Sequence, residues 1–60
     1  MVLTKLGQIM EDRGMTVEEL AVKAMMSSRS IMNAKKGKGV SRNTCKRIAK
    51  AFKIDLGQLI

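Results

Sequence analysis

Residues 16–37 read TVEELAVKAMMSSRSIMNAKKG and decide the fold, because they contain two helix starts with almost nothing between them. Thr16 is a cap residue for the first helix, and Glu19 is placed to reach back to the N–H of Thr16 in a capping box. Ser27 is the cap residue for the second helix. Only two methionines separate Ser27 from the expected end of the first helix.

The short link between these helices predicts how they cross. It leaves them no room to run antiparallel, and it favours the steep crossing of a helix-turn-helix, in which the second helix is carried outward and can enter a DNA groove. We expect the two helices over residues 17–24 and 28–36, with Gly37 ending the second.

The flanking sequence predicts three more helices: one over residues 3–13 that ends at Gly14, one over residues 42–52 after the cap Ser41, and a short one from Leu56 after the cap Asp55. Gly7 would weaken the first of these by about 1 kcal/mol relative to alanine, unless a neighbour packs closely there. No run alternates as a strand requires. The expected fold is all-α, a compact five-helix domain over residues 1–60. Its inward faces are expected to hold Leu3, Leu6, Ile9, Met10, Leu20, Ala21, Ala24, Ile31, Ala34, Cys45, Ile48, Ala49 and Phe52.

Length and composition exclude several classes of protein. Sixty residues leave little core to wall an active site, there is no histidine, and no nucleophile sits beside a base, so we expect no enzymatic activity. Cys45 is the single cysteine, so no zinc-binding Cys/His set can form and no cofactor is expected. The chain has no apolar run of signal-peptide or membrane-spanning length, which predicts a soluble protein of the reducing cytoplasm.

The net charge of +7 is concentrated in one half of the chain. Residues 1–26 hold three basic and four acidic side chains, whereas residues 27–53 hold nine basic side chains and no acidic one. Such a block is typical of proteins that bind a polyanion, although lysine-rich solvated surfaces are also common. Because the block begins at the outward helix of the pair, we expect nucleic acid to be the partner.

A set of residues across almost the whole chain has a specific joint spacing: Gly14-Met15-Thr16, Glu19-Leu20-Ala21, Lys23-Ala24, Met26-Ser27, Ser30-Ile31, Gly37-Lys38, Ser41, Ile48-Ala49-Lys50-Ala51-Phe52 and Ile54-Asp55-Leu56. On these residues the chain resembles, from Leu6 to Leu59, the lambda-repressor-like helix-turn-helix domains of lambdoid phage repressors and Cro proteins. The resemblance implies sequence-specific binding of duplex DNA by a small phage or bacterial transcriptional regulator, a repressor.

The outward helix carries the expected base contacts. At about 100° per residue, Ser28, Arg29, Met32, Asn33 and Lys36 share one sector, while Ser30, Ile31 and Ala34 face away. By the resemblance, the residues that face base edges in the major groove are Ser28, Arg29, Met32 and Asn33. Their chemistry suits this role, because arginine pairs bidentately with guanine, asparagine pairs with adenine, and methionine can contact a thymine methyl.

The expected phosphate contacts form a second set. The starts of the paired helices offer free N–H groups to an anion at Thr16, Val17 and Ser27, and the resemblance places Lys36, Lys38 and Arg42 beside the DNA backbone. Lys46, Lys50 and Lys53 are expected to form a solvated face. Leu56, Leu59 and Ile60 are candidates for a dimer contact, or they close the core. We expect a monomer or weak homodimer that pairs on DNA.

Four positions depart from the family pattern. Val17 stands where a glutamine is usual, and Met25 replaces the glycine common in the turn, with strain of order 1 kcal/mol if its φ is positive. Met10 and Lys35 occupy the positions of an arginine and a glutamate that often pair. The contact set is therefore a variant of the family's, and the target sequence cannot be carried over from relatives.

Two other functions remain open from the sequence. The scaffold could serve as a protein-interaction module, antitoxin-like or anti-repressor, that has lost base readout. The charge alone would also suit a binder of RNA or of nucleic acid without sequence preference. The second is disfavoured, because single-strand recognition uses aromatic stacking and the only aromatic residue, Phe52, is assigned to the core.

Overall fold

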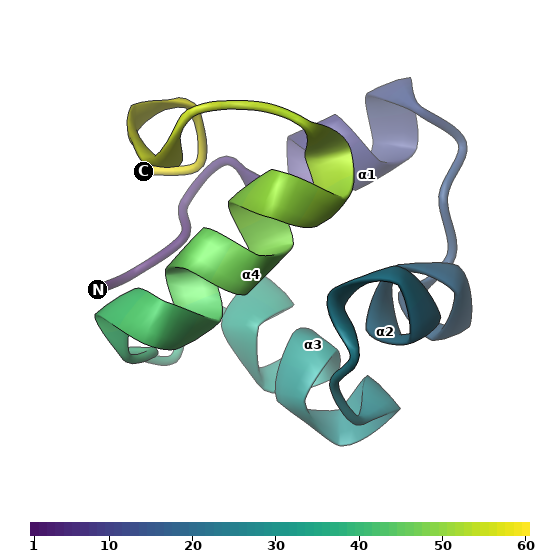
Figure 1. Ribbon diagram of the computed structural model, residues 1–60, viewed down its shortest axis with the longest axis horizontal. Helices are drawn as coiled ribbons and strands as arrows, with labels where there is room; N and C mark the ends of the chain where they lie inside the picture. Colours follow the sequence, from purple (N-terminus) through teal and green to yellow (C-terminus); the bar gives the residue numbers. More distant parts are fainter.

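Four α-helices follow one another in the computed structural model, which describes residues 1–60 (Figure 1). They are α1 (Leu6–Asp12), α2 (Val17–Ala24), α3 (Ser28–Lys35) and α4 (Arg42–Phe52), and a 3₁₀ turn, η1 (Leu56–Gln58), follows them. The all-α prediction is confirmed, whereas the predicted fifth α-helix is only this three-residue 3₁₀ turn. No helix is long and apolar enough to span a membrane.

Helices α2, α3 and α4 begin at the predicted caps. Thr16, Ser27 and Ser41 each accept, through the side-chain hydroxyl, the backbone N–H three residues later, at 3.2 Å in every case. At Thr16 the capping box is complete, because Glu19 Oε1 accepts the Thr16 N–H at 3.0 Å. Each cap satisfies one of the N–H groups that a helix start leaves without an internal partner.

All four helices end in the same hydrogen-bonded motif, in which a residue in the left-handed conformation reverses the chain. The left-handed residues are Gly14, Met25, Gly37 and Lys53, with φ of 60°, 56°, 95° and 59°. After α3, for example, the Gly37 N–H donates to Ala34 O at 3.2 Å and the Lys38 N–H donates to Asn33 O at 3.1 Å. Glycine adopts this conformation freely, whereas it costs about 1–2 kcal/mol at each of the other two residues, Met25 and Lys53.

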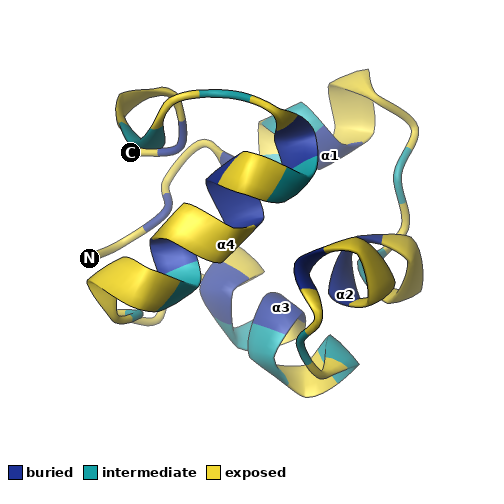
Figure 2. Ribbon diagram, in the orientation of Figure 1, coloured by how far each residue is buried: buried dark blue, intermediate teal, exposed yellow.

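The core lies where α1, α2, α3 and α4 meet. Helix α2 packs against α3 and α4, α1 packs against α3, and η1 packs against α4. Figure 2 shows the buried stripe of each helix turned toward this centre. Burial raises the pKa of the Cys45 thiol, against the opposing effect of the N-terminal amine, so this core thiol is neutral at pH 7. The core residues are Leu3, Leu6, Met10, Leu20, Ala21, Ile31, Ala34, Cys45, Ile48, Ala49, Phe52 and Leu59.

The start of the chain differs from its prediction. Helix α1 begins at Leu6 rather than Leu3, yet Leu3 is only 1% exposed and belongs to the core. Helical spacing predicted its burial correctly and its conformation wrongly. The turn before α1 is held to the other end of the chain, because the Lys5 N–H donates to Leu59 O at 2.9 Å.

Leu59 takes the second of its two predicted roles. Its side chain is fully buried, so it closes the core and has no surface to offer a second subunit. Of the three candidates for a dimer contact, Leu56 is half-buried and Ile60 is 45% exposed. Only these two remain available for such a contact.

Arg13 ties the end of α1 to the end of α4. Its Nη1 donates to Phe52 O at 2.8 Å, and its guanidinium carbon lies 5.4 Å from the centroid of the Phe52 ring. The first contact satisfies a carbonyl that the helix end leaves free, and the second is a cation–π interaction.

Gly7 meets no backbone of another element. A Cβ added there would lie 3.8 Å from the nearest atoms, Cγ and Cε of Lys35, which is ordinary van der Waals contact. No close approach therefore requires glycine at this position.

Candidate nucleic-acid interface

Helix α3 presents a polar face to solvent. Ile31 and Ala34 are fully buried, whereas Arg29 is exposed and Met32 is 45% exposed. Ser28 and Asn33, the other two predicted base contacts, are half-buried at the edges of this face. Figure 2 shows the buried side of α3 facing the core and its exposed side facing away from it. The four predicted base contacts thus lie on one outward face, which we call the reading face.

The start of α3 leaves donors free for an anion. The Ser27 hydroxyl is already occupied, since it accepts the Ser30 N–H at 3.2 Å and lies 2.9 Å from the Ser30 hydroxyl. The N–H groups of Ser28 and Arg29 have no partner inside the helix. No acidic residue stands in this first turn.

The segment between α3 and α4 is basic and exposed. Lys36 directly follows α3, Lys38 follows Gly37, and Arg42 opens α4. The side chains of all three cations are exposed. The first turn of α4 also lacks acidic residues, and Ser41 caps it at the Thr44 N–H. The N–H groups of the first two residues of α4 are therefore free to meet a phosphate.

Asn43 belongs to this surface and was not predicted. It is exposed, beside Arg42 in the first turn of α4. The signal in the sequence was the cap at Ser41, which makes the next two residues the N–H donors of a helix start.

Comparison with known families bears on this arrangement. The pattern of the Cro/C1-type HTH DNA-binding domain matches residues 5–60. This chain belongs to that family. Neither a curated protein nor a solved structure shows a significant match to the chain. The chain thus carries a DNA-binding domain, whose helix-turn-helix consists of α2, α3 and the turn between them.

The start of α2 in this Cro/C1-type domain is less suited to an anion than the starts of α3 and α4. Its first turn holds Glu18 and Glu19, both exposed. Hydrogen bonds from the backbone N–H and then the side chain of Thr16 lower the pKa of Glu19, so this carboxyl is ionised at pH 7. Two carboxylates beside the predicted phosphate contacts Thr16 and Val17 would repel a phosphate.

The side chains at those two positions offer little more. The Thr16 hydroxyl accepts the Glu19 N–H, and Val17 is half-buried against the core. Only backbone N–H groups remain there as donors.

The turn of this Cro/C1-type domain bears the predicted strain. Met25 has φ of 56°, so the methionine occupies the left-handed conformation that glycine usually supplies. Met10, at the position of the usual arginine, is 2% exposed and fills the core. Lys35 is exposed at the end of α3, with its stem against Gly7.

Proposed function

We propose that this protein reads a specific sequence in duplex DNA by inserting α3 into the major groove. The outward position of Arg29, flanked by Met32 and Asn33 on one face of a capped helix, carries this proposal. Arginine and asparagine are the side chains that pair bidentately with guanine and adenine, each good pair discriminating by about 1–3 kcal/mol.

The phosphate contacts would set the register of the protein on the duplex. Three features support them: the free N–H groups at the starts of α3 and α4, the exposed cations Lys36, Lys38 and Arg42, and the absence of acidic residues from both first turns. The neighbouring Asn43 adds a neutral donor. The acidic first turn of α2 would contribute least.

The regulatory role we propose is repression in a phage or a bacterium. A domain bound to an operator excludes other proteins from that DNA by occupancy alone. Helix-turn-helix proteins usually bind as dimers to half-sites about 34 Å apart. With Leu59 buried, only Leu56 and Ile60 of the three candidates offer apolar surface for self-association. We therefore propose a monomer or weak dimer that pairs on DNA.

Selection of bound sites from a random duplex library, at a stated salt concentration, tests the proposal. A recovered consensus with two-fold symmetry would support reading by a pair of subunits. Equal affinity for unrelated duplexes, with a steep salt dependence, would contradict sequence-specific reading. Analytical ultracentrifugation without DNA tests the oligomeric state, and a tight dimer at micromolar concentration would contradict pairing on DNA.

A further inference from the structure

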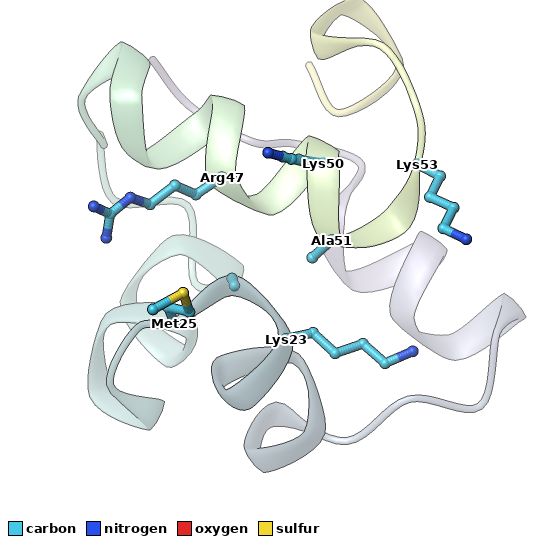
Figure 3. A pocket seen from close by; sticks show the side chains of 7 residues that line it. Lys23, Met25, Arg47, Lys50, Ala51 and Lys53 are labelled. Atoms are coloured by element: carbon cyan, nitrogen blue, oxygen red, sulfur yellow. The ribbon is translucent and has the colours of Figure 1, made fainter.

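A hollow of about 570 Å³ lies between the end of α2 and the second half of α4, at the surface where these helices pack. Four cations line it and no acidic residue does, and we call this hollow the basic groove. Its floor is apolar, formed by Ala24 and Ala51, with Met25 at one edge. Figure 3 shows the basic side chains extending from both walls. These cations are Lys23, Arg47, Lys50 and Lys53.

The basic groove is distinct from the surface assigned to DNA. None of its lining residues is among the predicted base or phosphate contacts. Lys50 and Lys53 are exposed, as expected of a solvated face, and they also border a concave site with Lys23 of another helix.

Backbone conformation marks the same place independently. Of the four residues that end helices in the left-handed conformation, two are glycines, and neither glycine lines the basic groove. The other two, Met25 and Lys53, both line it. The left-handed conformation is unfavourable for every residue except glycine. In this chain, the non-glycine residues that adopt it are the two that line the groove.

Packing in the free protein does not account for these two side chains. Met25 is 84% exposed and Lys53 is also exposed, so neither recovers its backbone strain by burial. Val22, one turn before Met25 on α2, is 78% exposed. Met25 and Val22 are the two most exposed large apolar side chains of the protein, and of the two only Met25 lines the groove.

We propose that the basic groove binds an acidic segment of a partner protein, which presents carboxylates to the cations and an apolar side chain to Met25. The unopposed positive charge requires an anionic occupant. The apolar floor and edge favour a polypeptide over a bare phosphate, because a phosphate has no apolar surface to bury there. Methionine and arginine are both enriched at protein interfaces, and methionine adapts to irregular partners.

Titration of the ¹⁵N-labelled protein with a synthetic amphipathic helical peptide, glutamates on one face and leucines on the other, tests this proposal. We expect amide shifts concentrated at Lys23, Met25, Arg47 and Ala51. Arg47→Gln combined with Lys50→Gln should weaken binding by about tenfold. The matched control Lys46→Gln removes an exposed cation of the same helix that does not line the groove, and it should leave the affinity unchanged.

Substitution of the strained residue Met25 is a second test, because it should change stability and peptide binding in opposite directions. Met25→Gly should raise Tm, because relief of the left-handed penalty outweighs the greater freedom of glycine in the unfolded chain. The same variant should weaken peptide binding. A role of Met25 in the fold alone would change Tm and leave the affinity for the peptide as it was.

Several results would overturn the proposal. They are shifts centred on α3 rather than the groove, equal binding of a peptide with glutamine in place of glutamate, and equal binding of inorganic tripolyphosphate. Concentration-dependent shifts of the same amides without peptide would assign the groove to a second copy of the chain and would also overturn it. Site selection with the Arg47→Gln, Lys50→Gln variant separates the two functions, since it should recover the same DNA consensus as the unmodified protein.

Discussion

Arg29 concentrates the proposed readout in one side chain. Arg29 is the second residue of α3 and its side chain is exposed. A bidentate contact to guanine requires such an unobstructed guanidinium. Arg29→Ala should reduce affinity for the selected site by about 1–3 kcal/mol and relax the preference at one base pair. Binding measured on duplexes that vary at each position checks this. Lys46→Ala is the control, and a loss of affinity that is equal for all sequences would assign Arg29 to phosphate instead.

Gly7 allows a prediction about stability that involves no binding. The added methyl group of Gly7→Ala meets only the flexible stem of Lys35 at 3.8 Å. The substitution should raise the free energy of unfolding by less than about 1 kcal/mol, because alanine has the higher helix propensity but Gly7 lies in the first turn of α1. Chemical denaturation of the two proteins measures the difference. A decrease in stability would show that α1 and α3 must approach more closely than this structure has them.

The helices themselves show what could be predicted from the sequence. The boundaries of α2 and α4 were predicted correctly because their signals are local: a hydroxyl cap at the start and an apolar repeat along the helix. The start of α1 was wrong because an apolar residue at helical spacing, Leu3, is buried from a non-helical turn. The last segment was too short to complete an α-helix.

The helix ends and the concave surface were harder to predict. Gly14 and Gly37 marked two ends, and Met25 was suspected only by comparison with a family pattern. Lys53 gave no signal, because a lysine in the left-handed conformation cannot be distinguished from any other lysine by sequence. The basic groove was also missed, since it combines residues of α2 and α4 that spacing within one helix cannot relate. Among the candidate site residues, the outward position of the reading face could be predicted because its residues lie on one helix, whereas its base contacts stay a prediction.

The capping box at the start of α2 makes stability depend on pH. The folded-state pKa of Glu19 is lowered from the ordinary value of 4.5 by hydrogen bonds from Thr16. The ionised Glu19 carboxylate therefore stabilises the folded protein above the unfolded-state pKa, and this contribution is lost as pH falls through the folded-state pKa. Glu19→Gln keeps an acceptor but does not titrate, so it should be less stable than the unmodified protein at pH 7 and equal to it in acid. Thermal unfolding of both proteins from pH 7 into acid measures the difference in Tm between them. A difference that stays constant with pH would contradict the role of the Glu19 carboxylate in the cap.

At the scale of the whole molecule, our proposals assign the cations of the basic block to two surfaces rather than one. Lys36, Lys38 and Arg42 follow the reading face along the chain, whereas Arg47 and Lys50 border the basic groove. The charge block in the sequence predicted a polyanion partner but could not divide the cations between surfaces, because that division depends on how α4 lies against α2.

Salt dependence of DNA binding tests this division. Each phosphate contact contributes about one unit to the slope of log affinity against log salt concentration. Lys38→Gln should reduce the slope by about one, whereas Lys50→Gln should leave it unchanged. A reduced slope for both variants would extend the DNA surface over α4 and into the groove.

The hydrogen bond from the Lys5 N–H to Leu59 O holds the opening segment of the chain against its closing turn. Figure 1 shows the two termini on the same side of the view. A circular permutant, with a glycine-rich linker joining residue 60 to residue 1 and new ends between Lys38 and Gly39, should therefore keep its native helices. Such a molecule should fold cooperatively. It should bind DNA weakly, because the new ends would fall within the basic loop that carries predicted phosphate contacts. Circular dichroism and a DNA-binding titration on one sample would show whether the helical fold can be kept while DNA affinity is lost.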